Sequence, residues 1–370
     1  MPDLETKEET AVDAARQRKS RKAARTERLA VEKDVLKRLR LVAVAYSHVK
    51  TAWFPTREAY EAEVEVEQRA KEVVAALKKL GVKAKAYRAD RYFMAKLLVD
   101  QPDLVLNLVD TLRGSDALQT SIPGALELAG VSYTGAGMRG LVIGNDRHLA
   151  KELLDANEVP TPPYQLVTRR GTPLRDDLEL PLIVKLNESG GSVGIDNEAP
   201  KESYEAAQQQ ADMLIETYKM PVIVERFIDG PEITAIVFDD GEQVHVFCGD
   251  KVFKASEDRK YLFTSFESYR DPDCYHYAPV DPAVEEAVAA YARTAFEVLR
   301  CRDYAKFDVR IDIRTGTPYF IDANPNTAFG PAPGLPMTEV LLLHGVRFPR
   351  VLASLMTKHA RRIYGSSQSA

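Results

Sequence analysis

The sequence predicts an α/β protein of three lobes, in which the N-terminal lobe is built on a parallel, doubly wound sheet. The first observation is that short apolar runs alternate with amphipathic helical stretches between residues 41 and 135, which is the rhythm of βαβ units. The second is a proline-rich joint, Val-Pro-Thr-Pro-Pro at 159–163, which separates this region from the rest. The third is length, because 370 residues exceed one ordinary core.

The composition excludes several classes of protein. A formal net charge of −5 gives no basic field that would draw the chain onto nucleic acid. No apolar run reaches the length of a membrane span, and the N-terminus does not read as a signal peptide. Cys248, Cys274 and Cys301 are scattered, which argues against a zinc knuckle or a disulfide framework. We therefore expect a cytoplasmic protein without a nucleic-acid or membrane partner.

Residues 1–40 differ from the remainder of the chain. They hold 12 Lys/Arg and 8 Asp/Glu residues and neither glycine nor an aromatic residue. Because the charges are mixed in sign, we expect a charged, solvated helical extension. The alternative is a docking arm for a partner or for an acidic surface.

The N-terminal lobe is expected to span residues 41–145. Its strands are predicted at 41–45, 82–87, 104–108 and 131–135, and its helices at 57–80, between the second and third strands, and at 122–129. Gly81 can end the first helix in the left-handed conformation.

The central lobe is predicted at 146–225 and the C-terminal lobe at 226–365. The central lobe should contain strands 182–185 and 222–225 and helix 201–218, and the C-terminal lobe strands 232–248, 305–313 and 317–323 and a helix near 338–358.

The first candidate site follows strand 182–185, where Lys185 precedes a loop containing Gly190, Gly191, Ser192 and Gly194. Glycines let backbone N–H groups turn toward an anion, and the lysine adds a point charge. This combination is typical of phosphate binding, although a glycine-rich turn between two strands is more often a simple hairpin.

The second candidate site is Glu225 to Glu232, where an apolar strand runs into alternating acidic and apolar residues. Glu225 could accept from an adenine amino group and Glu232 from ribose hydroxyls, while Phe227 and Ile228 offer apolar surface and backbone groups. Ordinary solvated acids at strand ends explain these residues equally well.

The third candidate site lies on two late strands joined by a turn near residue 315. Asp308 belongs to the first strand, and Asp322 and Asn324 share one face of the second. Two carboxylates and an amide oxygen are hard ligands suited to Mg²⁺. The alternative is a turn stabilised by Asn-Pro with cross-strand charge pairs.

In this order and spacing, the three segments resemble the ATP-grasp superfamily, and within it the D-alanine–D-alanine ligase-like branch. Residues 119–137, the run Asn-Asp-Arg at 145–147 and the joint 159–163 strengthen the resemblance. It implies an ATP-grasp fold in which ATP binds between the central and C-terminal lobes, with the N-terminal lobe on the substrate side. It also implies small-molecule carboxylate and amine substrates and a homodimer.

The resemblance implies the following roles. Nucleotide binding falls to Arg147, Lys185, Glu225, Phe227, Ile228 and Glu232, two Mg²⁺ ions (or Mn²⁺ as a substitute) to Asp308, Asp322 and Asn324, and catalysis to Lys306, Ser192 and Gly191. The implied reaction phosphorylates a carboxylate with ATP, lets an amine attack the acyl phosphate, and releases ADP and phosphate.

Departures from the family pattern fall largely on the substrate side. Arg147 replaces a usual lysine and Lys306 a usual arginine, which changes the geometry of anion binding. Gly191 and Pro333 stand where the family has serines, and the first-strand loop reads Ala-Tyr-Ser-His-Val-Lys at 45–50 in place of a Gly-Gly turn with serine and glutamate.

Two points stay open at this stage. The family's lysine before residue 275 has three candidates, Lys254, Lys260 and Arg270, and His48 is a candidate substrate contact. We expect the ligase chemistry to be kept and the substrates to be changed. The alternatives are a divergent D-alanine–D-alanine ligase and a non-catalytic nucleotide-binding scaffold.

Overall fold

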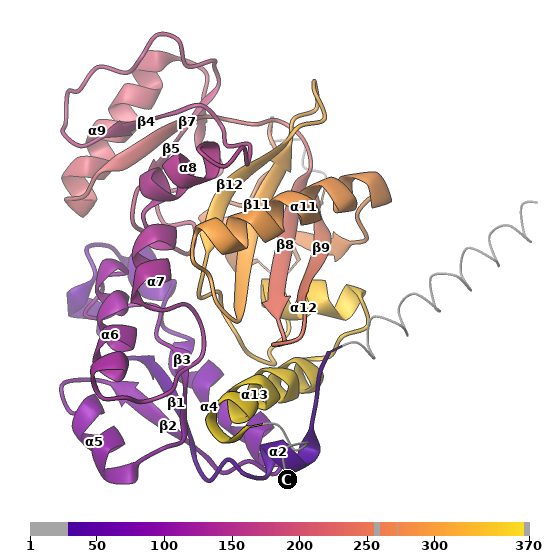
Figure 1. Ribbon diagram of the computed structural model, residues 1–370. Helices are drawn as coiled ribbons and strands as arrows, with labels where there is room; N and C mark the ends of the chain where they lie inside the picture. The colour runs from indigo at the N-terminus through magenta and orange to yellow at the C-terminus, as the bar shows by residue number, and fades with distance from the viewer. Residues whose placement is uncertain (1–28, 255–259, 272, 366–370) are drawn as a thin grey trace, which may run out of the picture.

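The computed structural model describes residues 29–254, 260–271 and 273–365. Three β-sheets organise this part of the chain (Figure 1). Each sheet carries helices on one or both faces, and the three sheets belong to successive stretches of sequence.

The N-terminal sheet is parallel and has helices on both faces, as predicted. Its strands β1 (Val42–Ser47), β2 (Ala84–Ala89) and β3 (Leu104–Leu108) lie in the order β2-β1-β3. Val42 and Val44 pack with helix α4 (Val66–Lys79) on one face. The alternate residues Ala43 and Ala45 pack with α5 (Phe93–Asp100) and α6 (Ser121–Leu128) on the other. The segment 131–135 joins the edge through a parallel bridge between Val105 and Tyr133.

The predicted helix 57–80 is wrong as one unit. The structure has α3 (Arg57–Glu61) and α4, with a turn at residues 62–65 between them. Ala59 and Ala62 pack on the hydrophobic cluster of the central lobe, whereas α4 packs on β1. One straight helix could not reach both surfaces, so the helix breaks.

The central sheet is antiparallel and is covered on one face by α9 (Tyr204–Tyr218). Its order is β4-β7-β5-β6, with β4 Tyr164–Val167, β7 Val222–Arg226, β5 Leu182–Leu186 and β6 Pro200–Lys201. The helix begins later than predicted because Ser203 accepts from Ala206 N as its N-cap and residues 200–201 pair with β5 instead.

The C-terminal sheet is antiparallel, in the order β10-β9-β8-β11-β12. Its strands are β8 Glu232–Asp239, β9 Val244–Phe253, β10 Tyr275–Ala278, β11 Tyr304–Ile311 and β12 Pro318–Asn324. The predicted strand 232–248 is therefore two strands of a hairpin, because Asp240 and Gly241 form a turn between them. Helix α11 (Pro282–Val298) covers one face, together with part of α8 (Arg147–Asp155).

The other face of this sheet is covered by two helices where one was predicted near 338–358. They are α12 (Pro336–Leu343) and α13 (Phe348–Tyr364), inclined at 104° and separated by a turn at Gly345. Among the described residues no single helix is long and apolar enough to cross a membrane; only this bent pair has the length and composition. Both helices pack in a hydrophobic core that also contains residues of β1 and α4.

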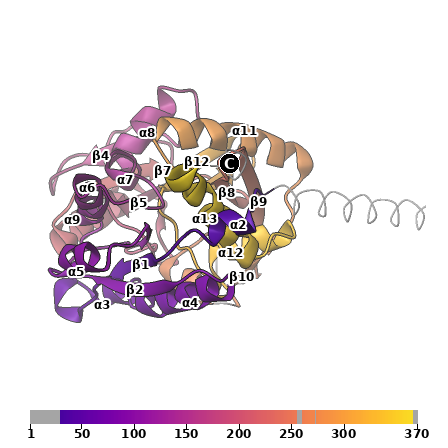
Figure 2. The ribbon, with the colours of Figure 1, turned by 60° about the horizontal axis from the view of Figure 1, so that its bottom comes forward.

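The expectation of a solvated helix is wrong for residues 29–40. Leu29, Val35, Leu36 and Leu39 are buried in the core that contains α13, and only α2 (Lys33–Leu36) is helical. Figure 2 shows α2 lying against α13. Residues 1–28, on which the rest of that expectation falls, lie outside the described residues. The remaining short helices are α7 (Met138–Asn145), α10 (Phe266–Arg270), η1 (Thr51–Trp53) and η2 (Ala117–Thr120).

Candidate active site

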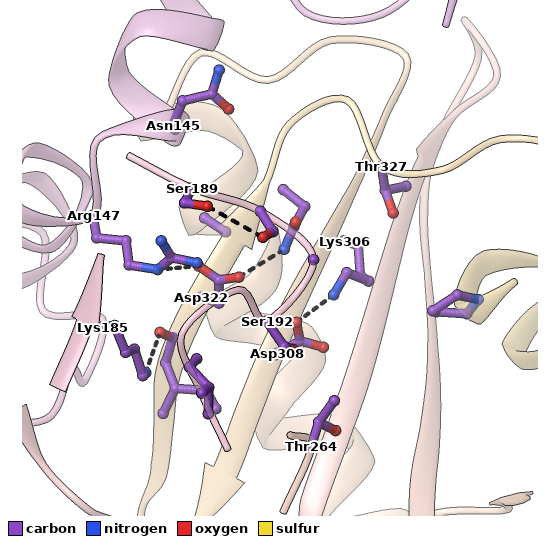
Figure 3. Close-up of a pocket in the computed structure, with 18 of the residues that line it drawn as sticks. Asn145, Arg147, Lys185, Ser189, Ser192, Thr264, Lys306, Asp308, Asp322 and Thr327 are labelled. Carbon is purple, nitrogen blue, oxygen red and sulfur yellow. Dashed lines mark hydrogen bonds and ion pairs between the residues drawn. The ribbon is translucent and has the colours of Figure 1, made fainter. Parts of the chain in front are cut away.

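A cavity of about 210 Å³ lies where the three lobes meet. Every candidate site residue predicted from the sequence lines it: Arg147, Lys185, Gly191, Ser192, Glu225, Phe227, Ile228, Glu232, Lys306, Asp308, Asp322 and Asn324. Figure 3 shows several of these side chains facing one another. Segments more than 170 residues apart in the sequence thus meet in one place, while the role of each residue stays a prediction.

The side-chain alternation of β11 separates core from cavity. Ala305, Phe307 and Val309 pack on the α11 side of the sheet, so Lys306 and Asp308 point to the opposite face and line the cavity.

A β-bulge determines which side chains of β12 point into the cavity. Asp308 pairs with Asp322 but Val309 pairs with Phe320, which leaves Ile321 as an extra residue. Phe320 packs on the α11 side, and without the bulge Asp322 would face the same side. The bulge therefore directs Asp322 and Asn324 into the cavity, beside Asp308.

The carboxylates of the predicted metal site are paired with cations. Arg147 Nε lies 3.0 Å from Asp322 Oδ1, and Lys306 forms an ion pair with Asp308 (Figure 3). Burial acts to raise the pKa of Asp322, but the charges of Arg147, Lys306 and Lys185 outweigh it, so the pKa is lowered. Asp322 is therefore ionised and available as an anionic ligand at neutral pH.

On the central sheet, Lys185 and Glu225 form a buried pair. Lys185 Nζ lies 3.0 Å from Glu225 Oε2 and donates to the backbone oxygen of Ile321 at 3.3 Å. Lys151, which was not predicted as a site residue, lies 3.4 Å from the other Glu225 oxygen. Burial lowers the pKa of Lys151 to about 8. Because this pKa is close to neutral pH, a polyanion bound nearby would favour the charged form of Lys151.

Glu232 forms a second buried network, with Lys251 Nζ at 2.8 Å and Arg310 Nη1 at 3.0 Å. Burial opposes ionisation of Glu232, but these two cations dominate and lower its pKa to about 2. Arg310 also donates to the backbone oxygens of Ile228 and Gly230, which fixes the segment between β7 and β8.

Lys251 was not among the three sequence candidates for the family's lysine, but it lines the cavity and is a further candidate for that role. Among the three candidates, Lys254 and Arg270 are exposed on the surface and Lys260 pairs with Glu202 away from the cavity. A signal for Lys251 was present in the hairpin: counting outward from the Asp-Gly-Glu-Gln turn at 240–243 pairs Asp239 with Val244 and so places Lys251 opposite Glu232, the pairing that the structure has.

One wall of the cavity is apolar. Ile183, Ile195, Phe227 and Phe263 form a hydrophobic cluster that lines it. The Arg310 guanidinium lies 4.8 Å from the centre of the Phe227 ring. An apolar wall bordered by carboxylates and backbone groups is suited to a nucleobase.

The glycine-rich loop closes the cavity and touches the N-terminal lobe. Gly190 N donates to Asp116 Oδ2 at 2.8 Å, and Gly194 N donates to Glu58 Oε1 at 2.7 Å. Gly191 has a φ of +64°, which a residue with a side chain adopts only with strain. Two amides of the proposed phosphate loop are thus engaged by carboxylates.

His48 lies outside this cavity, contrary to expectation. It lines a separate hollow with Trp53, at a ring-centre distance of 4.9 Å, and with Arg88 and Arg113. The loop after β1 turns this way because Ser47 Oγ, at the strand end, accepts from the backbone N–H groups of Asp110 and Thr111. Among the described residues, no three His, Cys, Asp or Glu side chains gather as a metal site.

Comparisons with known proteins show the family to which this chain is similar. A sequence profile of the D-ala D-ala ligase C-terminus family matches residues 153–357. A D-alanine–D-alanine ligase of Polaromonas naphthalenivorans is 33% identical over 58% of this chain and 66% of its own length. One from a Polaromonas species is 30% identical over 68% of this chain and 74% of its own.

A further relative and a solved structure are also similar to this chain. An uncharacterized protein of Sinorhizobium fredii, y4sG, is 29% identical over 68% of this chain and 76% of its own length. The solved structure of D-alanine–D-alanine ligase from Bacillus anthracis complexed with ATP covers 88% of this chain and 98% of its own, with a TM-score of 0.67 and 19% identity.

The fold, with its cavity lined by residues of two antiparallel sheets, is that of an ATP-grasp ligase. The matching family profile then places the protein more closely. The chain belongs to the D-alanine–D-alanine ligase-like family of ATP-dependent carboxylate–amine ligases.

Proposed function

We propose that this protein joins a small carboxylate to an amine through an acyl phosphate, releases ADP and phosphate, and makes a product other than D-alanyl-D-alanine. One observation carries the proposal. Lys185, Asp308, Asp322 and Asn324, which come from two different lobes, line a single cavity. A polyanion and a divalent cation together account for this mixture of opposite charges.

The nucleotide is held as follows. The base lies on the apolar wall that contains Phe227, with Ile228 and Glu225 at its edge, and Glu232 accepts from the ribose hydroxyls. The phosphates take Arg147, Lys185 and Lys251 as partners, while the loop around Ser192 closes over them. Several of these cations are paired with buried carboxylates in the structure, so each is already oriented toward the cavity.

Asp308, Asp322 and Asn324 fit a divalent cation because they offer two carboxylates and an amide oxygen on one face of a hairpin. Phosphate oxygens would replace the carboxylates as partners of Arg147 and Lys306, which frees those carboxylates to hold Mg²⁺. Two Mg²⁺ ions would neutralise negative charge on the transferred phosphoryl group.

Lys306 is proposed to stabilise the anionic oxygen that forms when the amine attacks. Inside the cavity, Lys306 lies directly opposite Asn324 on the neighbouring strand and forms an ion pair with Asp308. A lysine supplies a point charge there and lacks the two parallel donors of an arginine. Gly191 and Ser192 would contribute backbone and hydroxyl donors from the loop.

The divergent D-alanine–D-alanine ligase is the second candidate. It is disfavoured because the first-strand loop, where the family orients the first D-alanine, here lines the separate hollow with His48. The nucleotide-binding scaffold is disfavoured because Lys185, Asp308, Asp322 and Asn324 are retained, and a scaffold need not keep metal ligands. We also propose a homodimer, which light scattering after size exclusion tests.

The deciding experiment is a coupled ADP-release assay over a panel of acids and amines with Mg·ATP. A specific acid–amine pair that drives turnover supports the proposal. Turnover with D-alanine alone would restore the second candidate, and no substrate-stimulated turnover with any pair would favour the scaffold.

A further inference from the structure

The N-terminal lobe contributes an acidic end to the cavity. Three carboxylates line it: Glu63 from the turn between α3 and α4, and Asp110 and Asp116 from the segment after β3. The cation of this end is Arg69 of α4, 3.0 Å from Asp110. Among the described residues that line this end, three negative charges therefore face one positive charge.

The end of the cavity proposed to bind the nucleotide has an excess of positive charge. Its lining cations are Arg147, Lys185, Arg226, Lys251, Lys306 and Arg310, and its lining carboxylates are Glu225, Glu232, Asp308 and Asp322. The excess is thus two positive charges at one end and two negative charges at the other. ATP and its metal account for the first end and leave the second unexplained.

Unused hydrogen-bonding groups lie at the acidic end. Gln119 is only 6% exposed and lines the cavity, and none of the side-chain hydrogen bonds between described residues involves its amide. Glu63 Oε2 is enclosed and likewise has no hydrogen-bond partner in the described part of the chain. Buried polar groups are normally satisfied, so the enclosed Glu63 oxygen points to a ligand, and the Gln119 amide offers a further donor and acceptor in the same cavity.

The titration of the carboxylates agrees with a missing counter-charge. Burial raises the pKa of Asp116 to about 6, even though Gly190 N donates to it. Burial also raises the pKa of Glu63, with Asp110 and Asp116 adding to the effect. A bound cation would reverse both shifts.

From this geometry we propose that the carboxylate substrate is a diamino acid, whose two ammonium groups bind Glu63, Asp110, Asp116 and Gln119. Two ammonium groups match the two uncompensated negative charges. The carboxylate of the same molecule is directed toward the cationic end, because Asp116 contacts Gly190 of the loop that closes over the phosphates. This inference rests on the proposed ligase function and narrows its substrate.

The test is direct binding of each diamino acid to the full chain with Mg·ADP, measured by calorimetry. The probes are 2,3-diaminopropionate, 2,4-diaminobutyrate, ornithine and lysine in both enantiomers. Each is compared with the monoamino acid in which a methyl group replaces the terminal ammonium. We expect the best diamino acid to bind at least about tenfold more tightly than its methyl counterpart.

Two variants test whether the acidic end causes the preference for a diamino acid over its methyl counterpart. Glu63→Gln and Asp116→Asn should each reduce the preference for the diamino acid severalfold. Glu63→Gln should also leave ADP binding and thermal unfolding near wild type, whereas Asp116→Asn reports on the preference alone because Asp116 also accepts from Gly190 of the phosphate loop. The matched control is Glu65→Gln, an exposed acid of the same turn, which should keep the full preference. Equal binding of the two probe classes, no binding of any diamino acid, or a preference that survives both variants would overturn the inference.

The outcome separates this inference from the proposed function. ADP release with an acid that carries a single amino group would keep the ligase function and reject the diamino acid. Diamino-acid binding without ADP release for any amine would keep the acidic subsite and reject the ligase.

Discussion

At the scale of single residues, the cavity is organised as pairs of opposite charge. Arg147 with Asp322, Lys185 with Glu225, and Lys251 with Glu232 are each mostly buried. Burying such charges costs free energy unless each has a partner. The pairs therefore keep the protein folded without nucleotide and hold the same groups ready for phosphate and metal.

Asp322→Asn should reduce ADP release by orders of magnitude, because it removes one anionic ligand of the proposed metal site and leaves the core intact. Turnover at saturating ATP and circular dichroism measure the two effects. Glu297→Gln on α11, an exposed acid, serves as the control. Near-normal turnover in Asp322→Asn would remove the metal assignment.

Lys251→Met should weaken ATP binding and lower stability by about 3 kcal/mol, because Glu232 would lose one of its two buried cations. Equilibrium dialysis with ATP and urea unfolding test both effects. Lys254→Met, which removes an exposed lysine close by, should do neither. If the two variants bind ATP equally well, Lys251 is not a phosphate ligand.

At the scale of elements, residues 29–40 act as a strap across the C-terminal helix. Arg350 of α13 donates to Leu29 O, Glu32 N donates to Thr357 Oγ1 at 3.1 Å, and Arg361 forms an ion pair with Glu32. The same segment then enters β1. The segment that leads into the N-terminal sheet is thereby attached to α13, the helix that covers the C-terminal sheet.

Deletion of residues 1–28 should leave thermal unfolding and ADP release unchanged, because the strap stays complete. Deletion of residues 1–40 should lower the thermal midpoint by about 5 °C or more, since it removes Leu29, Val35, Leu36 and Leu39 from the core. Differential scanning calorimetry compares the two truncations. Equal midpoints would show that the strap adds no stability.

At the scale of the whole molecule, Asp303 connects the N-terminal lobe to the C-terminal lobe. This fully buried carboxylate accepts from Gly135 N at 2.8 Å and pairs with Lys358 Nζ at 2.9 Å and His359 Nε2 at 2.8 Å. Burial acts to raise the pKa of Asp303, but His359 and Lys358 outweigh it and lower the pKa. The ionised form is therefore the one that stabilises the folded protein.

Asp303→Asn should cost about 3 kcal/mol at neutral pH, because Lys358 and His359 would lose their common anion. A carboxylate with a lowered folded-state pKa contributes stability above its ordinary pKa and loses it as the pH falls below that value. The thermal midpoints of wild type and variant should thus converge as the pH falls from about 4 toward 2. A constant difference across that range would contradict the linkage.

Much of the architecture followed from local patterns in the sequence. Alternating apolar runs predicted the parallel N-terminal sheet, and strands 182–185, 222–225 and 104–108 lie within a residue or two of β5, β7 and β3. The twelve candidate site residues were found because glycines, strand-end acids and a lysine each have local chemical signatures. All twelve line one cavity.

The two errors in helix prediction have different physical origins. The break at residues 62–65 arises because the two halves of the predicted helix pack on different surfaces. No proline or glycine lies within 62–65, so local propensity favours continuity there, and the break is fixed by tertiary packing. The break near Gly345 has local signals, because Gly345 has a φ of +76° and Pro349 lies in the first turn of α13.

The sequence by itself determined the family and the set of candidate site residues, because these depend on residue type and on spacing along one strand or loop. Only the tertiary structure decided which groups meet. The bulge at Ile321 turns Asp322 into the cavity, strand register places Lys251 opposite Glu232, and lobe packing brings Glu63 to the glycine-rich loop. Contacts between distant segments depend on how whole elements pack, and no local pattern encodes that packing.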